Sequence, residues 1–279
     1  QNDTKTCPDT GMAGASRSLY MDGNATIIAA NKLLAAMRKE DGTLRTYDEM
    51  KAEGIETKYL GRYETNTTPG LCRLDPNTGI GDPTPAFTYC LNLAEVEVDT
   101  KTGKTTVLKF TCVDFVGRIG NIDAVNGQAY SGIMHGIGFA LKEDYADVKK
   151  HANMFGAGTS YIKDVPDDID LIHIDGAISD GPFGSSGASE AFQASGHCAV
   201  LNGIYNACGV RIHEIPALPE KVKAGLDAIE KGEKPYEPKK YFLGSDMYEE
   251  LENIKENPVQ VGTQSFYVSL DDPTAERPF

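Results

Sequence analysis

The chain has 279 residues, 40% hydrophobic and 24% charged, a composition typical of a soluble globular protein with one large domain or two ordinary ones. Its 41 acidic and 27 basic side chains leave a formal charge of -14, which repels phosphate backbones and argues against a nucleic-acid partner. No apolar run approaches the ~20 residues that cross a bilayer, and the polar N-terminus lacks an export signal, so we expect no membrane span and a cytoplasmic location.

The cysteines and the start of the chain carry further expectations. Six cysteines show no Cys-x-x-Cys pair and no spacing typical of zinc or iron–sulfur sites. Four of them lie in apolar segments, where a small buried thiol is the simplest interpretation, and a reducing compartment is favoured. The polar start at Gln1 predicts either a piece of a longer protein or a processed N-terminus.

The first half of the chain predicts two helices, a long connection and a hairpin. Apolar residues at helical spacing indicate a helix over about 24–39, and a short polar helix follows and ends at Gly54. Residues 61–85, rich in Gly, Pro, Thr and Asn, predict an irregular connection. In residues 86–117, apolar residues alternate on both sides of "DTKTGK", which predicts a β-hairpin.

A glycine-bearing helix and a strand come next. The helix is expected over Ala124–Leu141 and contains four glycines. Each glycine costs about 0.5–1 kcal/mol relative to alanine, so something must approach this backbone closely. The sequence "DLIHIDG" at 170–176 then predicts a strand.

The last elements are helical. A Gly/Ser loop leads into one helix over Ser189–Cys208, with Gly209 as its C-cap, and another helix begins at Pro219 and ends at Gly232. Few strands among long helices predict an α+β fold with a small antiparallel or mixed sheet. We expect residues 1–234 to form one region and 235–279 to be a tail of that region, running over its surface.

Three segments of Gly, Ser and Ala enter or lie in helices: "TGMAGASRSLYMDGN", "VNGQAYSGIMHGIG" and "GPFGSSGASE". Such segments leave backbone N–H groups unpaired and permit close approach, as an anionic ligand requires. Helix capping explains each segment taken alone, whereas the three together favour a large phosphate-bearing ligand. The P-loop and dinucleotide-binding glycine patterns are absent.

Glu190 is the main candidate for chemistry, with two interpretations left open. It could stabilise a helix N-terminus through the helix dipole; a reciprocal capping box fails because Gly187 stands where Ser or Thr is needed. Alternatively, since no charge follows until Arg211, the carboxylate is expected in a largely buried element, which is a mark of a general base.

The other polar candidates are assigned structural roles. His197, seven residues after Glu190, is expected on the same helix side, in the core with one hydrogen bond. His135 is also assigned to packing, while His151, His173 and His213 show no partner spacing. Asp114 and Arg118 are expected to form a local ion pair.

The motifs "CPDTGMAGASRS", "GNIDAVNGQAYSGIMHGIGFAL" and "GPFGSSGASEAFQASGHCAVLNGIYNACGVRI" resemble the C-terminal part of the molybdenum-binding region in the xanthine oxidase family, most closely its bacterial aldehyde oxidoreductases. The resemblance implies a molybdenum–molybdopterin cytosine dinucleotide cofactor, with no protein ligand placed directly on the metal. By position, it assigns cofactor contacts to Gly14, Ala15, Ser16, Ser18, Gln128, Gly187, Ala188 and Ser189.

The same resemblance implies a reaction. Glu190 would act as general base on a molybdenum-bound hydroxide, so that an aldehyde becomes a carboxylic acid with water as oxygen source. Iron–sulfur clusters on upstream segments or partner subunits would carry electrons away, and a homodimeric assembly is expected. Ser189 and Ala191 flank the glutamate, where purine-oxidising members usually have Gly and Pro; this favours aldehydes. The alternatives are a hydroxylase of purine- or nicotinate-type N-heterocycles and a non-catalytic assembly module.

Overall fold

The computed structural model describes residues 13–65, 86–147 and 149–233, together with residues 3, 5–8, 10, 75, 81 and 84. The chain divides into two units, Gln1–Tyr236 and Glu237–Phe279. The predicted tail 235–279 lies outside the described residues, as does most of the predicted connection 61–85. All helices and strands in the described ranges belong to the first unit.

The first two helices match the prediction except at one end. Helix α1 spans Ser18–Met37 and so begins earlier than the predicted start near residue 24. The reason is Gly23, which interrupts the helical sequence pattern but lies inside the helix, where an added Cβ would be 2.6 Å from Cγ of Pro182. Helix α2 spans Tyr47–Ala52 and has a capping box between Thr46 and Glu49.

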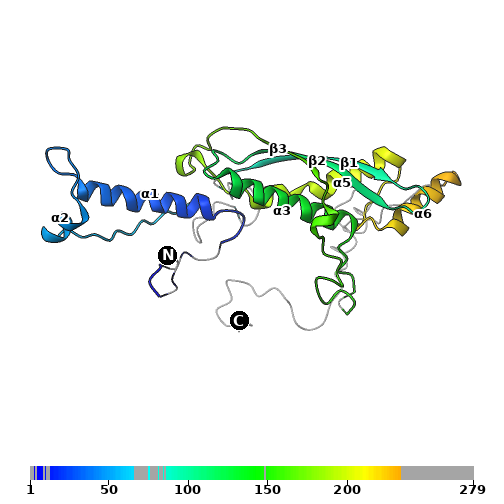
Figure 1. Cartoon of the computed structure of the whole chain (residues 1–279), viewed down its shortest axis with the longest axis horizontal. Helices are drawn as coiled ribbons and strands as arrows, with labels where there is room; N and C mark the ends of the chain where they lie inside the picture. The colour runs from blue at the N-terminus through cyan, green and yellow to red at the C-terminus, as the bar shows by residue number, and fades with distance from the viewer. Residues whose placement is uncertain are drawn as a thin grey trace. The chain divides into compact units, whose positions relative to one another are not determined.

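The strands of the first unit form a three-stranded sheet. Strands β1 (Tyr89–Val98) and β2 (Thr105–Phe115) form the predicted antiparallel hairpin. Strand β3 (Asp168–His173) pairs in parallel with β2, giving the order β1-β2-β3. This small mixed sheet and the helices beside it confirm the α+β prediction (Figure 1).

Helix α3 (Ile122–Leu141) shows why its glycines are needed. A Cβ on Gly132 would lie 2.5 Å from Cβ of Phe192, and one on Gly136 would lie 2.9 Å from Cα of Gly196. The close approach predicted from these glycines therefore exists at both positions, and the approaching groups are the neighbouring helices.

The single helix predicted over Ser189–Cys208 is wrong, because the structure has two helices there, α4 (Ser189–Ala194) and α5 (Gly196–Cys208). They meet at Ser195, which has φ -124° and ψ 0°. Asn92 on β1 donates a side-chain hydrogen bond to Oγ of Ser195 at 2.9 Å. Gly209 ends α5 with φ 77°, as predicted, and α6 spans Pro219–Glu230.

The core lies between the sheet and helices α3 to α5. Phe110 and Cys112 point inward from β2, Ile133 comes from α3, and Phe192 and Val200 come from α4 and α5; all five are fully buried. Two 3₁₀ turns complete the unit, one at Ile162–Asp164 and one at Pro182–Gly184.

Candidate functional site

Two segments from opposite ends of the unit meet where the sequence predicts a cofactor loop. The hydroxyls of Ser16 and Ser189 lie 2.9 Å apart, and the backbone N–H of Glu190 donates to Oγ of Ser16 at 3.0 Å. A Cβ on Gly187 would lie only 1.4 Å from the carbonyl oxygen of Ser16. Residues 14–16 and 187–190 thus form one contact, in which Ser16 caps the first turn of α4.

The backbone of the first segment is strained. Ala15 and Ser16 have φ values of 53° and 54°, in the left-handed region that L residues other than glycine rarely adopt. Each such residue costs about 1–2 kcal/mol, and strain of this kind clusters at ligand sites. The carbonyl group and Cβ of Ser16 lie against Gly187, which has no side chain to obstruct them.

Gln128 and Ser18 lie on the helices that adjoin this contact. Gly132 meets Phe192 and Gly136 meets Gly196, so α3 and the pair α4–α5 run in the same direction where they are in contact. Gln128 lies one turn before Gly132, on the side of α3 that faces α4, and its side chain is exposed. Ser18 is the exposed first residue of α1 and lies two residues after Ser16.

Glu190 corrects one prediction. The low charge of the residues after it predicts a largely buried carboxylate, yet Glu190 is exposed. The uncharged residues on which that prediction rests belong to α5, and its Val200 and Ile204 pack into the core. Within the described part of the chain, the Glu190 carboxylate has no assigned hydrogen-bond or ion-pair partner, so it is open to solvent and to a bound group.

His197 also differs from its prediction. The break at Ser195 separates it from the helix of Glu190, so the two residues share no helix face. The ring is half-buried, in agreement with packing, but the expected hydrogen bond is missing at Nδ1, which is buried without a partner among the described residues.

A chain of three polar side chains, of which Asp114 is buried and the other two are partly buried, has no counterpart among the sequence predictions. Nδ1 of His173 lies 2.6 Å from Oδ2 of Asp114, and Nε2 of His173 lies 2.8 Å from Oδ1 of Asn126. The predicted ion pair between Asp114 and Arg118 is therefore replaced by a pair with His173. The parallel register of β2 and β3 places Asp114 opposite His173, and a strand register of this kind leaves no local signal in the sequence.

Cys90, Cys112, Cys198 and Cys208 form no disulfide with one another in the described part of the chain. Cys112 is buried, Cys90 and Cys208 are half-buried, and Cys7 and Cys198 are exposed. The thiols of Cys90 and Cys112 lie 3.4 Å apart, and their hydrogen bond lowers the pKa of Cys90 and raises that of Cys112. In the described ranges no group of three or more His, Cys, Asp or Glu residues could hold a metal ion.

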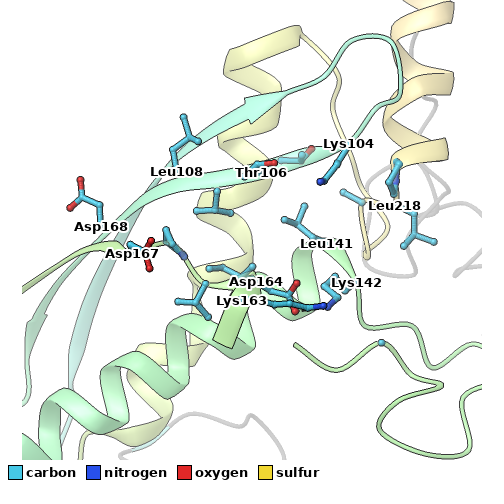
Figure 2. A pocket seen from close by; sticks show the side chains of 18 residues that line it. Lys104, Thr106, Leu108, Leu141, Lys142, Lys163, Asp164, Asp167, Asp168 and Leu218 are labelled. Atoms are coloured by element: carbon cyan, nitrogen blue, oxygen red, sulfur yellow. The ribbon is translucent and has the colours of Figure 1, made fainter. Parts of the chain in front are cut away.

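A large cavity lies elsewhere. It has a volume of 810 Å³ and is bounded by β2, the end of α3 at Ile137–Lys142 and the segment 163–168 (Figure 2). Its lining mixes apolar side chains with lysines and aspartates, including the ion pair between Lys142 and Asp164 at 2.5 Å. Gln128 and Leu141 are separated by about 20 Å along α3 at 1.5 Å per residue, so this cavity is distinct from the segments around Glu190.

No helix in the described ranges is long and apolar enough to cross a membrane.

Comparison with known proteins identifies the class of domain. Residues 1–166 match the model of the molybdopterin cofactor-binding domain, and the chain belongs to this family. This agrees with the resemblance seen in the motifs around Ser16 and Gln128.

Individual relatives are more specific. The chain is 44% identical over 225 residues to an aldehyde oxidoreductase of Megalodesulfovibrio gigas, covering 81% of this chain and 24% of the relative. It is 30% identical over 151 residues to a probable hypoxanthine oxidase of Escherichia coli, covering 53% of this chain and 16% of the relative. A solved aldehyde oxidoreductase from Desulfovibrio gigas superposes with a TM-score of 0.77 at 43% identity, over 81% of this chain and 24% of that chain. The chain therefore spans about a quarter of the length of its aldehyde oxidoreductase relatives.

Proposed function

We propose that the chain is the C-terminal portion of the molybdenum-binding region of an aldehyde oxidoreductase, which oxidises aldehydes to carboxylic acids with water as oxygen source. Residues 1–234 would contribute to the cofactor site, and residues 235–279 would be a tail of the same region. The observation that carries the proposal is the contact of Ser16 with Ser189 and Glu190, which joins two segments that the sequence assigns to one cofactor.

The residues at this contact fit a pterin dinucleotide. Gly187 lets the backbone of Ser16 approach, the strained segment 14–16 is exposed at Ala15, and two hydroxyls converge there. Gly14, Ala15, Ser16, Ser18, Gln128, Gly187, Ala188 and Ser189 would hold the cofactor, in its cytosine dinucleotide form. When bound, it supplies a metal that activates an oxygen nucleophile and accepts electrons from the substrate.

Glu190 is proposed as the general base. Ser16 fixes its backbone N–H at the start of α4, and its side chain remains exposed. A carboxylate anchored at its backbone and free at its oxygens can take a proton from a group placed beside it. Binding of cofactor and substrate would remove water from around the carboxylate.

The outer face of the sheet supports a larger assembly. Tyr89, Leu91 and Leu93 alternate along β1 and are 65%, 56% and 58% exposed, and Ile172 on β3 continues this face. A contiguous apolar patch is typical of an interaction surface. The proposed partners are the remaining molybdenum-domain and iron–sulfur segments or subunits, in a homodimeric cytoplasmic enzyme.

Aldehydes are favoured over N-heterocycles as substrates. Ser189 and Ala191 flank Glu190, and the aldehyde oxidoreductase relative is 44% identical, against 30% for the probable hypoxanthine oxidase. Side-by-side assays of aldehydes, purines and nicotinate distinguish the two enzyme classes. A non-catalytic assembly module predicts instead that the complex isolated with its natural partners contains neither molybdenum nor pterin.

Substitution of Glu190 tests the proposed role directly. In the assembled enzyme, Glu190→Gln should lower aldehyde turnover by about 10²–10⁴-fold, because the amide cannot accept the proton, while molybdenum and pterin contents stay unchanged. Glu220→Gln is the matched control, since Glu220 also lies in the first turn of a helix but belongs to α6. Turnover that survives in Glu190→Gln would remove this residue from the mechanism.

A further inference from the structure

The buried Asp114 and the partly buried His173 form a pair at the carboxyl ends of two parallel strands. They stand opposite each other in the register of β2 and β3, and Nδ1 of the imidazole is 2.6 Å from Oδ2 of the carboxyl group. Asp114 is 1% exposed, and its second oxygen, Oδ1, has no hydrogen-bond partner among the described residues. His173 is therefore the assigned polar partner of a carboxyl group held out of water, which makes the ring position well determined.

The other ring nitrogen of His173 reaches α3. Nε2 lies 2.8 Å from Oδ1 of Asn126. An amide oxygen can only accept, so in this arrangement Nε2 carries a proton and donates it. Asn126 lies near the start of α3, two residues before Gln128. The imidazole thus ties this end of the helix to the end of the sheet.

The same end of β2 also holds the loop that leads to Glu190. Ser186 donates its N–H to the carbonyl of Val116 at 3.1 Å, and Arg118 donates its N–H to the carbonyl of Gly184 at 2.9 Å. The hydroxyl of Ser185 donates to the carbonyl of Arg118 at 2.6 Å. Residues 114–118 therefore contact both the loop 184–186 and, through His173 and Asn126, the start of α3.

We propose that Asp114, His173 and Asn126 form a positioning chain that sets Gln128 relative to the loop 187–190. None of the three is assigned a contact with substrate or cofactor; they act through the placement of α3. This inference rests on the proposed function for its catalytic consequence, whereas the mechanical coupling can be measured without it. Substitution of side chains that orient the residues contacting a bound metal group commonly lowers affinity or activity about ten- to hundredfold.

Hydrogen exchange tests the coupling in the full chain. Removing His173 would strand a buried carboxyl group and endanger folding, so Asn126 is the residue to change. Asn126→Leu should speed amide exchange at residues 124–128 by about tenfold, as expected for loss of one side-chain hydrogen bond, and leave residues 133–141 unchanged. Asn126→Asp keeps an acceptor oxygen and should restore slow exchange. Equal exchange in wild type and Asn126→Leu would overturn the proposal.

Thr105→Val is the matched control, because Thr105 lies at the opposite end of β2 and its buried hydroxyl has no partner among the residues that the structure describes. It should leave exchange at residues 124–128 unchanged. In the assembled enzyme, Asn126→Leu should lower kcat about tenfold with unchanged cofactor content, and Asn126→Asp should recover it. A wild-type kcat in Asn126→Leu contradicts the catalytic consequence. If the assembled wild-type complex contains neither molybdenum nor pterin and oxidises no aldehyde, the proposed function fails, while the exchange result still decides on the coupling.

Discussion

The two faces of the sheet differ in what they bury. On the inner face, Phe110 and Cys112 are fully buried beneath helices α3 to α5. On the outer face, large apolar side chains such as Tyr89 and Leu91 are more than half exposed. The inner residues of β1 are small, and a Cβ on Gly203 of α5 would lie 3.1 Å from Val96. Tight packing on the inner face therefore depends on how well its side chains fit against the backbone of the neighbouring helix. The hydrophobicity of a face does not by itself tell whether that face is covered.

The largest expected effect breaks the inner face. Phe192→Ala removes a fully buried ring but keeps the Cβ and backbone that lie against Gly132, and this close helix contact leaves little freedom to collapse. We expect a loss of about 3–5 kcal/mol in the free energy of unfolding, measured by urea denaturation. A loss below about 1 kcal/mol would show that α3 and α4 are not closely packed in solution.

A pH series tests the carboxyl group on the inner face. Burial raises the pKa of Asp114, against the opposing hydrogen bond and charge of His173. A raised folded-state pKa gives a stabilising contribution that is complete below the ordinary value of 3.8 and is lost as pH rises through the raised value. The free energy of unfolding of the wild type should therefore fall relative to that of Asp114→Asn across this window. Parallel profiles of the two proteins would contradict this assignment.

The smallest effect is expected on the outer face. Leu91→Ser changes a side chain that is 56% exposed, so the free energy of unfolding of the chain should change by no more than about 0.5 kcal/mol. The proposed assembly predicts that the same substitution weakens copurification of the other segments or subunits. A cost close to that of Phe192→Ala would mean that the outer face is covered within this chain.

Local patterns predict most elements here, and long-range contacts account for the differences. The hairpin and the capped helix α2 follow from alternation and from polar residues at the right positions. At the break, Ser195 accepts a hydrogen bond from Asn92, which is more than a hundred residues away, and a contact at that distance has no local signal in the sequence. The glycines of α3 predict close approach, but nothing in their spacing says that other helices are the neighbours.

The candidate site divides in the same way. Gly/Ser composition points to the segments around Ser16 and Ser189, and the structure brings them into contact. The absence of charge after Glu190 suggests burial of its carboxylate, although it reflects the packing of α5. The partnership of Asp114 with His173 needs the parallel strand register, which becomes known only from the fold.

The cap that Ser16 provides for α4 has a consequence for the order of folding. Donor and acceptor are 174 residues apart in sequence, so the cap cannot form until residue 190 has been synthesised. Contacts of such high sequence separation close large loops and tend to form late. The first turn of the helix that presents Glu190 should therefore be among the last parts of this unit to order, after the hairpin between β1 and β2 has formed from neighbouring residues.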